Sequence, residues 1–289
     1  DMQTAVAVSI ANIAQSELNF DIYTNYELKQ QKEFVDIDPI AVKHYMNAMN
    51  ELGKLNVGEG GNWDTLTQLL KNAIDVDSSF LLAYTMLAHS ANQGHGWGSL
   101  SLQTARPAAH FAIDSAIKLD QDNHELQFQL AQIHLYLDLD YARAGSFFAQ
   151  RAESRPQYPL HHVFLAEIDL REGRASESLR RLATAAAADI TKLGAQQAIF
   201  FFILSNRQCM AGDCEGALSS SAKAIKLLSG GEAKTRGLTA HINNLLALGR
   251  VEEARPLIDE AWRLDGHISP ERYIYAFAMI GETAKARDI

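Results

Sequence analysis

The chain has 289 residues, 47% of them hydrophobic, which is enough to bury a large core in one extended array or in two compact domains. Its 26 basic and 35 acidic residues give a net charge of −9 with no basic block, so we do not expect this region to bind nucleic acid. No apolar run reaches the roughly 18 residues that indicate a membrane helix, and two cysteines are too few for a disulfide scaffold or a four-thiolate zinc site.

The first residues predict one helix followed by a connector. Apolar residues at helical spacing place an amphipathic helix within residues 1–20: Val6, Ile10, Ile13 and Leu18. The next stretch is polar and aperiodic, and Pro39 disfavours helix at Asp38, so the repeats are expected to begin at residue 40. Because residue 1 is not Met and no signal-peptide pattern follows it, we interpret the chain as a fragment of something longer or as a mature form.

The segment from residue 41 to residue 119 predicts two helical hairpins. The first pairs a helix over 41–54 with one over 63–76, and the second pairs 81–93 with 104–119. The second helices of both hairpins end alike, in AIDVD and AIKLD. Tyr84, Leu87 and Ala88 stand at the offsets where a tetratricopeptide unit carries its large aromatic residue, its leucine and its small residue.

Five further hairpins follow, and glycines mark the turns of the last four. Gly173, Gly212, Gly249 and Gly281 are 32 to 39 residues apart, close to the tetratricopeptide period of about 34. The seventh hairpin begins at about Pro270 and is incomplete. We therefore predict an all-α fold, a tetratricopeptide-like superhelix of about seven degenerate helical hairpins held together by nearest-neighbour packing.

The chain resembles the tetratricopeptide C-terminal region of CadC-like and ToxR-like winged-helix bacterial transcriptional regulators. The residues that carry the likeness are AIDVDSSFLLAYTMLAHSA, ARPAAHFAIDSAIKLDQDN after a long loop, and DLDYARAGSFFAQRA. Similar arrays also follow class III adenylate cyclase domains. The resemblance implies that residues 1–39 end a preceding α/β domain and that residues 40–289 form the repeat domain, with an incomplete last repeat.

This resemblance implies a non-catalytic sensory or regulatory domain of a transcriptional regulator. The alternatives are the accessory array of a class III adenylate cyclase and a stand-alone tetratricopeptide scaffold. The expected partners are a protein or peptide, a second copy of the chain, or a small ligand, and no cofactor is expected. If a membrane span precedes residue 1, the array is periplasmic, and otherwise it is cytoplasmic.

The concave face of such an array is lined by the first helix of each hairpin. At its outward offsets lie polar and aromatic residues that suit recognition of a peptide or small ligand: His89, Asn92, Gln93, Phe128, Gln132, Tyr136, Glu167, Arg171, Phe202 and Asn206. The glycine-rich insertion GHGWGSLS adds His95 and Trp97. The alternatives are a solvated surface, an intrahelical Glu167–Arg171 ion pair, and a Trp97 that packs back onto its neighbour.

The remaining histidines and the cysteines indicate no metal and no catalysis. His161 and His162 are adjacent, so on a helix they point about 100° apart and we expect them to be packed or exposed rather than metal ligands. The ten histidines could together give a response to acid. Cys209 and Cys214 lie close enough for a disulfide across a short loop, and two packed thiols are the alternative. No catalytic triad, carboxylate pair or phosphate loop is recognisable.

Overall fold

The computed structural model describes residues 36–57, 61–96, 99–155, 158–191, 193, 197–227, 231–265 and 273–289. These residues form fourteen α-helices and one π-helical segment, and they contain no strand. The helix predicted within residues 1–20, most of the connector, Trp97 and the predicted start of the seventh hairpin at Pro270 lie outside the described residues. The all-α prediction is confirmed over the described part.

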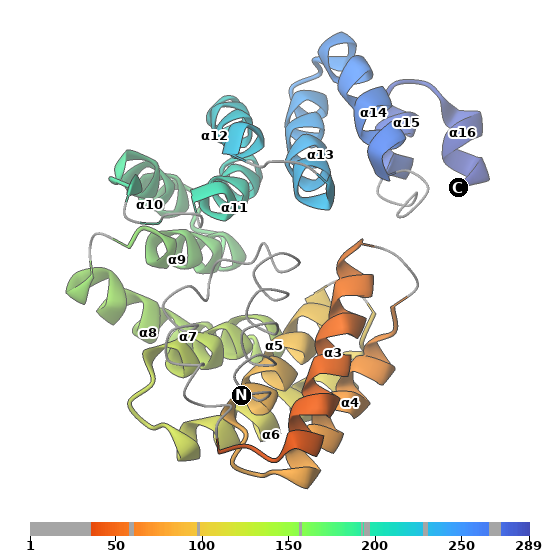
Figure 1. Ribbon diagram of the computed structural model, residues 1–289. Coiled ribbons are helices and arrows are strands. Elements are labelled where there is room, and N and C mark those ends of the chain that lie inside the picture. The colour runs from red at the N-terminus through yellow and green to blue at the C-terminus, as the bar shows by residue number, and fades with distance from the viewer. Residues whose placement is uncertain are drawn as a thin grey trace. The chain divides into compact units, whose positions relative to one another are not determined.

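The chain divides into two compact units between Phe147 and Phe148, within helix α8. In the first unit α3 packs against α4, α4 against α5, and α5 against α6, so that two hairpins stack in chain order (Figure 1). Its elements are α3 (Pro39–Val57), α4 (Trp63–Val76), α5 (Leu81–Gly96), α6 (Leu102–Leu119), α7 (His124–Ile133), η1 (His134–Asp138) and the first half of α8 (Tyr141–Ser154).

The second unit holds the rest of α8 and four further hairpins. The hairpin partners α9 and α10, α11 and α12, α13 and α14, and α15 and α16 pack against each other, and each first helix also contacts the next first helix. The elements are α9 (Leu160–Arg171), α10 (Ala175–Ala187), α11 (Gln197–Met210), α12 (Cys214–Leu227), α13 (Gly231–Ala247), α14 (Val251–Asp265), α15 (Ile274–Met279) and α16 (Thr283–Asp288). The prediction of about seven hairpins is thereby confirmed.

The turns of the last four hairpins contain the predicted glycines. Each has a left-handed backbone, with φ values of 78°, 100°, 71° and 86° at Gly173, Gly212, Gly249 and Gly281. A backbone hydrogen bond spans each turn, as from the Asp213 N–H to the carbonyl oxygen five residues earlier at 2.9 Å. This is the glycine-terminated helix end that satisfies the last carbonyl groups of a helix.

The core is built from small residues that let the helices approach closely and from larger ones that fill the gaps between turns. Tyr84, Leu87 and Ala88 are 6%, 0% and 1% exposed, as their tetratricopeptide offsets predict. Fully buried alanines recur on the second helices: Ala73, Ala109, Ala116, Ala217, Ala224, Ala254 and Ala261. Each packed hairpin thus depends on its neighbour for burial of its apolar stripe.

Helix α3 extends beyond the predicted range 41–54 at both ends, and two boundaries of the second hairpin differ from the prediction for local reasons. Helix α6 begins at Leu102 rather than at residue 104, because the Ser101 hydroxyl caps it by accepting a hydrogen bond from the Thr104 N–H at 3.2 Å. Helix α5 continues to Gly96 rather than ending at residue 93. Gly94 fits there because it lies against Leu100, whose Cδ1 would be only 2.7 Å from an added Cβ. His95 therefore belongs to a helix and not to the loop in which it was predicted.

Candidate interaction site

The first helices of the second unit form a continuous row, which we call the first-helix face: α9, α11, α13 and α15. An ion-pair bridge joins two of them. The Glu167 carboxylate on α9 accepts from Arg171 Nη2 at 2.9 Å, one turn along the same helix, and lies 2.7 Å from Arg207 Nη2 on α11. The Glu167 side chain is only 5% exposed. The predicted Glu167–Arg171 pair is thus present, and Arg207 extends it to the next repeat.

A second buried carboxylate ties the same helix to its own hairpin partner. Asp169 on α9 is 4% exposed, and its two oxygens lie 2.6 Å from Arg174 Nη2 and 2.7 Å from Arg181 Nε on α10. A buried carboxylate is costly unless ion pairs and hydrogen bonds compensate for lost hydration. Because Glu167 and Asp169 are paired in two directions, α9 is held in one orientation relative to α10 and α11.

Helix α11 carries the predicted residues Phe202 and Asn206, both half-buried. They precede Met210, whose side chain is 66% exposed at the end of the helix. Arg207 Nη1 lies 3.6 Å from the Met210 sulfur. The structure therefore places an aromatic ring, an amide, a guanidinium group and an exposed thioether along one helix of the first-helix face.

The two cysteines flank the turn that follows this helix. Cys209 is in the last turn of α11 and Cys214 is the first residue of α12, and their Sγ atoms are joined as a disulfide with a Cα–Cα distance of 4.0 Å. Of the two arrangements open from the sequence, the structure contains the bonded one. The bond closes the turn next to Met210.

The predicted site residues of the first unit that the structure describes are half-buried, as Phe202 and Asn206 are in the second. Helix α5 is buried from Leu82 to Ala88 without interruption, and His89, Asn92 and Gln93 beyond this run are half-buried. Burial lowers the pKa of His89 to about 4. His95 Nδ1 donates to the Leu100 carbonyl oxygen at 3.1 Å and holds the chain that follows α5.

The other predicted residues of this unit lie on the next first helix and its extension. Phe128 and Gln132 are half-buried on α7, and Tyr136 is half-buried in the π-helical segment η1. Their role as a binding site stays a prediction.

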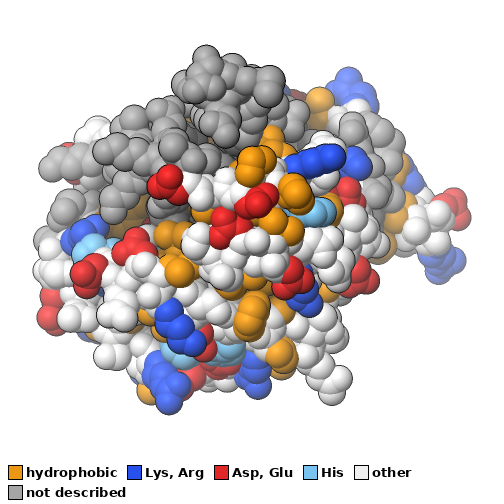
Figure 2. Space-filling view, turned by 60° about the horizontal axis from the view of Figure 1, so that its bottom comes forward, with side chains coloured by type: hydrophobic (Ala, Val, Ile, Leu, Met, Phe, Trp, Pro, Cys, Tyr) orange, Lys and Arg blue, Asp and Glu red, His pale blue; other side chains and the backbone are white. Residues whose placement is uncertain are grey.

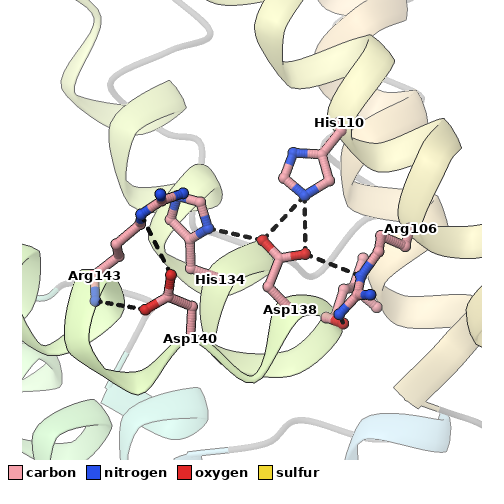
Figure 3. Close-up of polar contacts among 7 residues, drawn as sticks. Arg106, His110, His134, Asp138, Asp140 and Arg143 are labelled. Carbon is pink, nitrogen blue, oxygen red and sulfur yellow. Dashed lines mark hydrogen bonds and ion pairs between the residues drawn. The ribbon is translucent and has the colours of Figure 1, made fainter.

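A cluster that the sequence did not reveal surrounds Asp138 at the end of η1 (Figure 3). His110 Nε2 on α6 lies 3.0 Å from both carboxylate oxygens, and His134 Nδ1 lies 2.8 Å from one of them. Arg106 Nε lies 3.0 Å away, and its Nη2 donates to the Leu137 carbonyl oxygen. The contacts of Arg106 and His110 with this segment join residues about thirty positions apart, which the sequence does not reveal. Only the i, i+4 spacing of His134 and Asp138 is visible in the sequence.

The Asp138 cluster is an ion-pair cluster rather than a metal centre. Two imidazoles and a carboxylate could ligate a cation, but the Arg106 guanidinium occupies the same carboxylate and opposes a second positive charge. No group of three or more His, Cys, Asp or Glu residues in the described ranges has the arrangement of a metal site. Burial raises the pKa of Asp138, but the hydrogen bonds from His110 and His134 and their charge outweigh it and lower the pKa overall.

Of the adjacent histidines on α9, His161 is buried and His162 is half-buried. His161 is 4% exposed on α9, with its ring centroid 5.5 Å from that of Tyr158 and 6.4 Å from that of Phe148. Burial is the largest cause that lowers the pKa of His161, to about 4, and the charge of Arg151 adds to it. This histidine is therefore neutral at neutral pH.

Charges of both signs lie on the face that Figure 2 shows. Figure 2 shows acidic and basic side chains interspersed on one face, with hydrophobic side chains in small groups between them. None of the described helices combines the length and the hydropathy that crossing a membrane requires.

No protein-family model and no curated protein matches this chain. Among solved structures, yeast Tom70 superposes with a TM-score of 0.53 and 14% identity, over 99% of this chain and 59% of Tom70. PilW, a widely conserved type IV pilus biogenesis factor, covers 78% of this chain and 94% of its own length with a TM-score of 0.49 and 14% identity. Naa15/Naa10 bound to HypK-THB gives a TM-score of 0.37 and 15% identity, over 99% of this chain and 41% of that one.

The similarity to Tom70 shows the fold alone, a tetratricopeptide-like array of helical hairpins. The chain spans less than two thirds of Tom70. None of these three structures is described as a transcriptional regulator or a cyclase.

Proposed function

We propose that this chain is a non-catalytic repeat domain that binds a protein or peptide partner on the first-helix face of its second unit. The observation that carries the proposal is the bridge from Glu167 to Arg171 and Arg207, which joins successive first helices through a nearly buried carboxylate. Such a bridge fixes the relative position of two helices before a partner arrives. A pre-organised surface loses less conformational entropy on binding.

The residues beside the bridge support a protein partner. Met210 is 66% exposed, and Phe202 and Asn206 are half-buried on the same helix. Aromatic residues, methionine and arginine are enriched at the centres of protein interfaces, and methionine adapts its shape to different partners. The first-helix face therefore carries an aromatic side chain and a flexible methionine beside the ion pairs that hold its helices together.

The finer part of the proposal is that the domain serves a bacterial transcriptional regulator and passes a binding event to a DNA-binding domain encoded upstream. The resemblance of the three segments quoted above supports it, and the acidic net charge of −9 agrees with DNA being contacted elsewhere. The accessory array of a cyclase and a stand-alone scaffold are the alternatives. The gene sequence upstream of Asp1 tests all three, since a winged helix, a cyclase core and a signal peptide are easily told apart.

The binding face is tested with a matched pair of variants of the full chain. Met210→Glu puts a charge on the first-helix face, whereas Leu227→Glu puts one on the second helix of the same hairpin, where the side chain is 48% exposed. A photo-crosslinking residue at position 206 should capture a partner in cells, and Met210→Glu should abolish the crosslink while Leu227→Glu leaves it unchanged. If Leu227→Glu removes the crosslink and Met210→Glu does not, the partner binds elsewhere.

A further inference from the structure

A cation lies against two aromatic rings in the last two hairpins of the second unit. Trp262 on α14 and Phe277 on α15 have ring centroids 5.1 Å apart, and their ring planes are inclined at 75°. The ammonium nitrogen of Lys285 on α16 lies over both rings, 4.8 Å from the Trp262 centroid and 3.9 Å from the Phe277 centroid. Both distances are within the roughly 6 Å range of a cation–π contact. We call these two ring faces the aromatic corner.

The core of the second unit holds the two rings of the aromatic corner in place. Phe277 is fully buried, and Trp262 is half-buried and packs against the same hydrophobic cluster. The ring of Tyr273 meets that of Trp262 at 88° with centroids 5.5 Å apart, and the Tyr273 hydroxyl donates to the Ala261 carbonyl oxygen at 3.1 Å. The packing of α14 and α15 therefore sets the shape of the corner.

The lysine that occupies the corner is held less firmly than the rings. Its side chain is 37% exposed, and no residue of α16 is buried. The Glu282 carboxylate lies 3.9 Å from the Lys285 nitrogen, and an exposed ion pair at this distance contributes little. Lysine also has a flexible side chain of four methylene groups. Rotation of this one side chain therefore empties the corner without moving a helix.

The corner suits a less hydrated cation than a primary ammonium group. A lysine ammonium is a compact, strongly hydrated charge, so part of its attraction to the rings is offset by lost hydration. Methyl groups on the nitrogen reduce its hydration and add apolar surface that both rings can cover. The charged groups beside the corner are Glu282 and Arg255, which lie 3.7 Å apart and offset each other. The ring faces therefore select the ligand.

We propose that the aromatic corner binds a quaternary or methylated ammonium group, and that Lys285 occupies the corner when no such ligand is bound. The methyl groups of the ligand contact Trp262 and Phe277, and its positive charge faces both rings. The ammonium group can come from a free choline-like molecule or from a trimethylated lysine of a protein. The corner is a different surface from the partner site on α9 and α11, so this proposal does not rest on the proposed function.

The test uses the full chain and two probes of the same shape that differ in charge. They are choline and the neutral alcohol in which a tert-butyl group replaces its trimethylammonium group. In calorimetric titrations choline should bind about fivefold more tightly, the ratio that a cation–π contact at a partly exposed site supports. Equal affinities for the two probes, or no binding of any methylated ammonium probe, would overturn the proposal.

Two further probes distinguish the sources of the ammonium group: trimethyllysine and unmodified lysine, each blocked as its acetyl amide. Tighter binding of blocked trimethyllysine than of choline indicates a protein side chain, and the reverse order indicates a free small molecule. Blocked lysine should bind more weakly than its trimethylated form. If methylation does not increase the affinity, the preference for a less hydrated cation is wrong.

Three variants connect the binding to the corner. Lys285→Ala removes the internal competitor and should tighten choline binding about three- to tenfold. Arg287→Ala removes an equal charge from an exposed residue of the same helix and should leave the affinity unchanged. Trp262→Leu removes one ring and should abolish the preference for choline over its neutral analogue. Lys285→Ala keeps both rings, so its expected gain in affinity remains a test if Trp262→Leu fails to fold. An unchanged choline affinity in Lys285→Ala contradicts the proposed competition.

Discussion

The buried histidine on α9 makes the second unit sensitive to acid. Burial lowers the pKa of His161 to about 4 in the folded chain, from the ordinary histidine value of 6.5. Between these values the unfolded chain binds a proton that the folded chain does not, so the free energy of unfolding falls as the pH falls. Above pH 6.5 both states are neutral and the effect is absent. Below pH 4 both are protonated and the loss is complete.

The size of the effect follows from proton linkage. One histidine contributes about 1.4 kcal/mol for each pH unit within this window, so the free energy of unfolding should fall by about 2 kcal/mol between pH 7 and pH 5. His161→Phe removes the titrating group and keeps an aromatic ring between Tyr158 and Phe148, whose centroids lie 5.5 and 6.4 Å from that of His161. The variant should therefore lose this part of the pH dependence.

Urea unfolding followed by circular dichroism at pH 5, 6 and 7 measures the difference, and hydrogen exchange of the α9 amides assigns it to this helix. The matched control is His124→Gln, which removes an exposed histidine from the first turn of α7 and keeps His161, so the fall that His161 causes between pH 7 and pH 5 should persist. If the parent and His161→Phe curves stay parallel from pH 7 to pH 5, the linkage argument is refuted.

Three other changes have expected outcomes. Gly249→Ala should cost about 1 kcal/mol in thermal or urea unfolding, because φ is 71° there and no atom lies near an added Cβ, so only the backbone conformation opposes it. Arg207→Met removes the ion pair between Arg207 and the buried Glu167 carboxylate and should cost about 2 kcal/mol in the same assay, since hydrogen bonds to buried charges are stronger than neutral ones. For Cys209, alkylation without reductant should leave the mass unchanged and alkylation after reduction should add two groups, whereas Cys209→Ser should cost no more than about 2 kcal/mol because the bond to Cys214 closes a short loop.

The sequence was informative wherever a local rule determined the structure. The glycines that end the first helices were predicted because a left-handed residue is required there and glycine adopts it without strain. Tyr84, Leu87 and Ala88 were predicted to be inside because helical spacing places them on one stripe. Each of these predictions depends only on the identity of a residue and of its close neighbours in the sequence. The Glu167–Arg171 pair was recognisable for the same reason.

The contacts that define the candidate sites were not predicted, because they join residues from different repeats. Arg207 meets Glu167 from forty positions away, about one repeat later. Lys285 on α16 meets Trp262 on α14, one hairpin earlier. In a stacked array, the residue one repeat later is brought alongside by nearest-neighbour packing. A search for opposite charges separated by about one repeat could have suggested the first of these pairs.

The third hairpin shows how one extra residue changes a repeat. Its turn has the same left-handed backbone as the glycine turns, but the residue there is Leu139, with φ of 56° and 52% exposure. The hydrogen bond across the turn runs from the Asp140 N–H to the His134 carbonyl oxygen, six residues back instead of five. A π-helical turn contains one residue more than an α-helical turn, so η1 accommodates the insertion while the turn keeps its bond. The insertion also places Asp138 one position from the strained residue, where Arg106 and His110 hold its carboxylate. The leucine at a glycine position and the charge cluster around Asp138 therefore both result from the same inserted residue. A sequence analysis that assumes a strict α-helical period does not predict either of them.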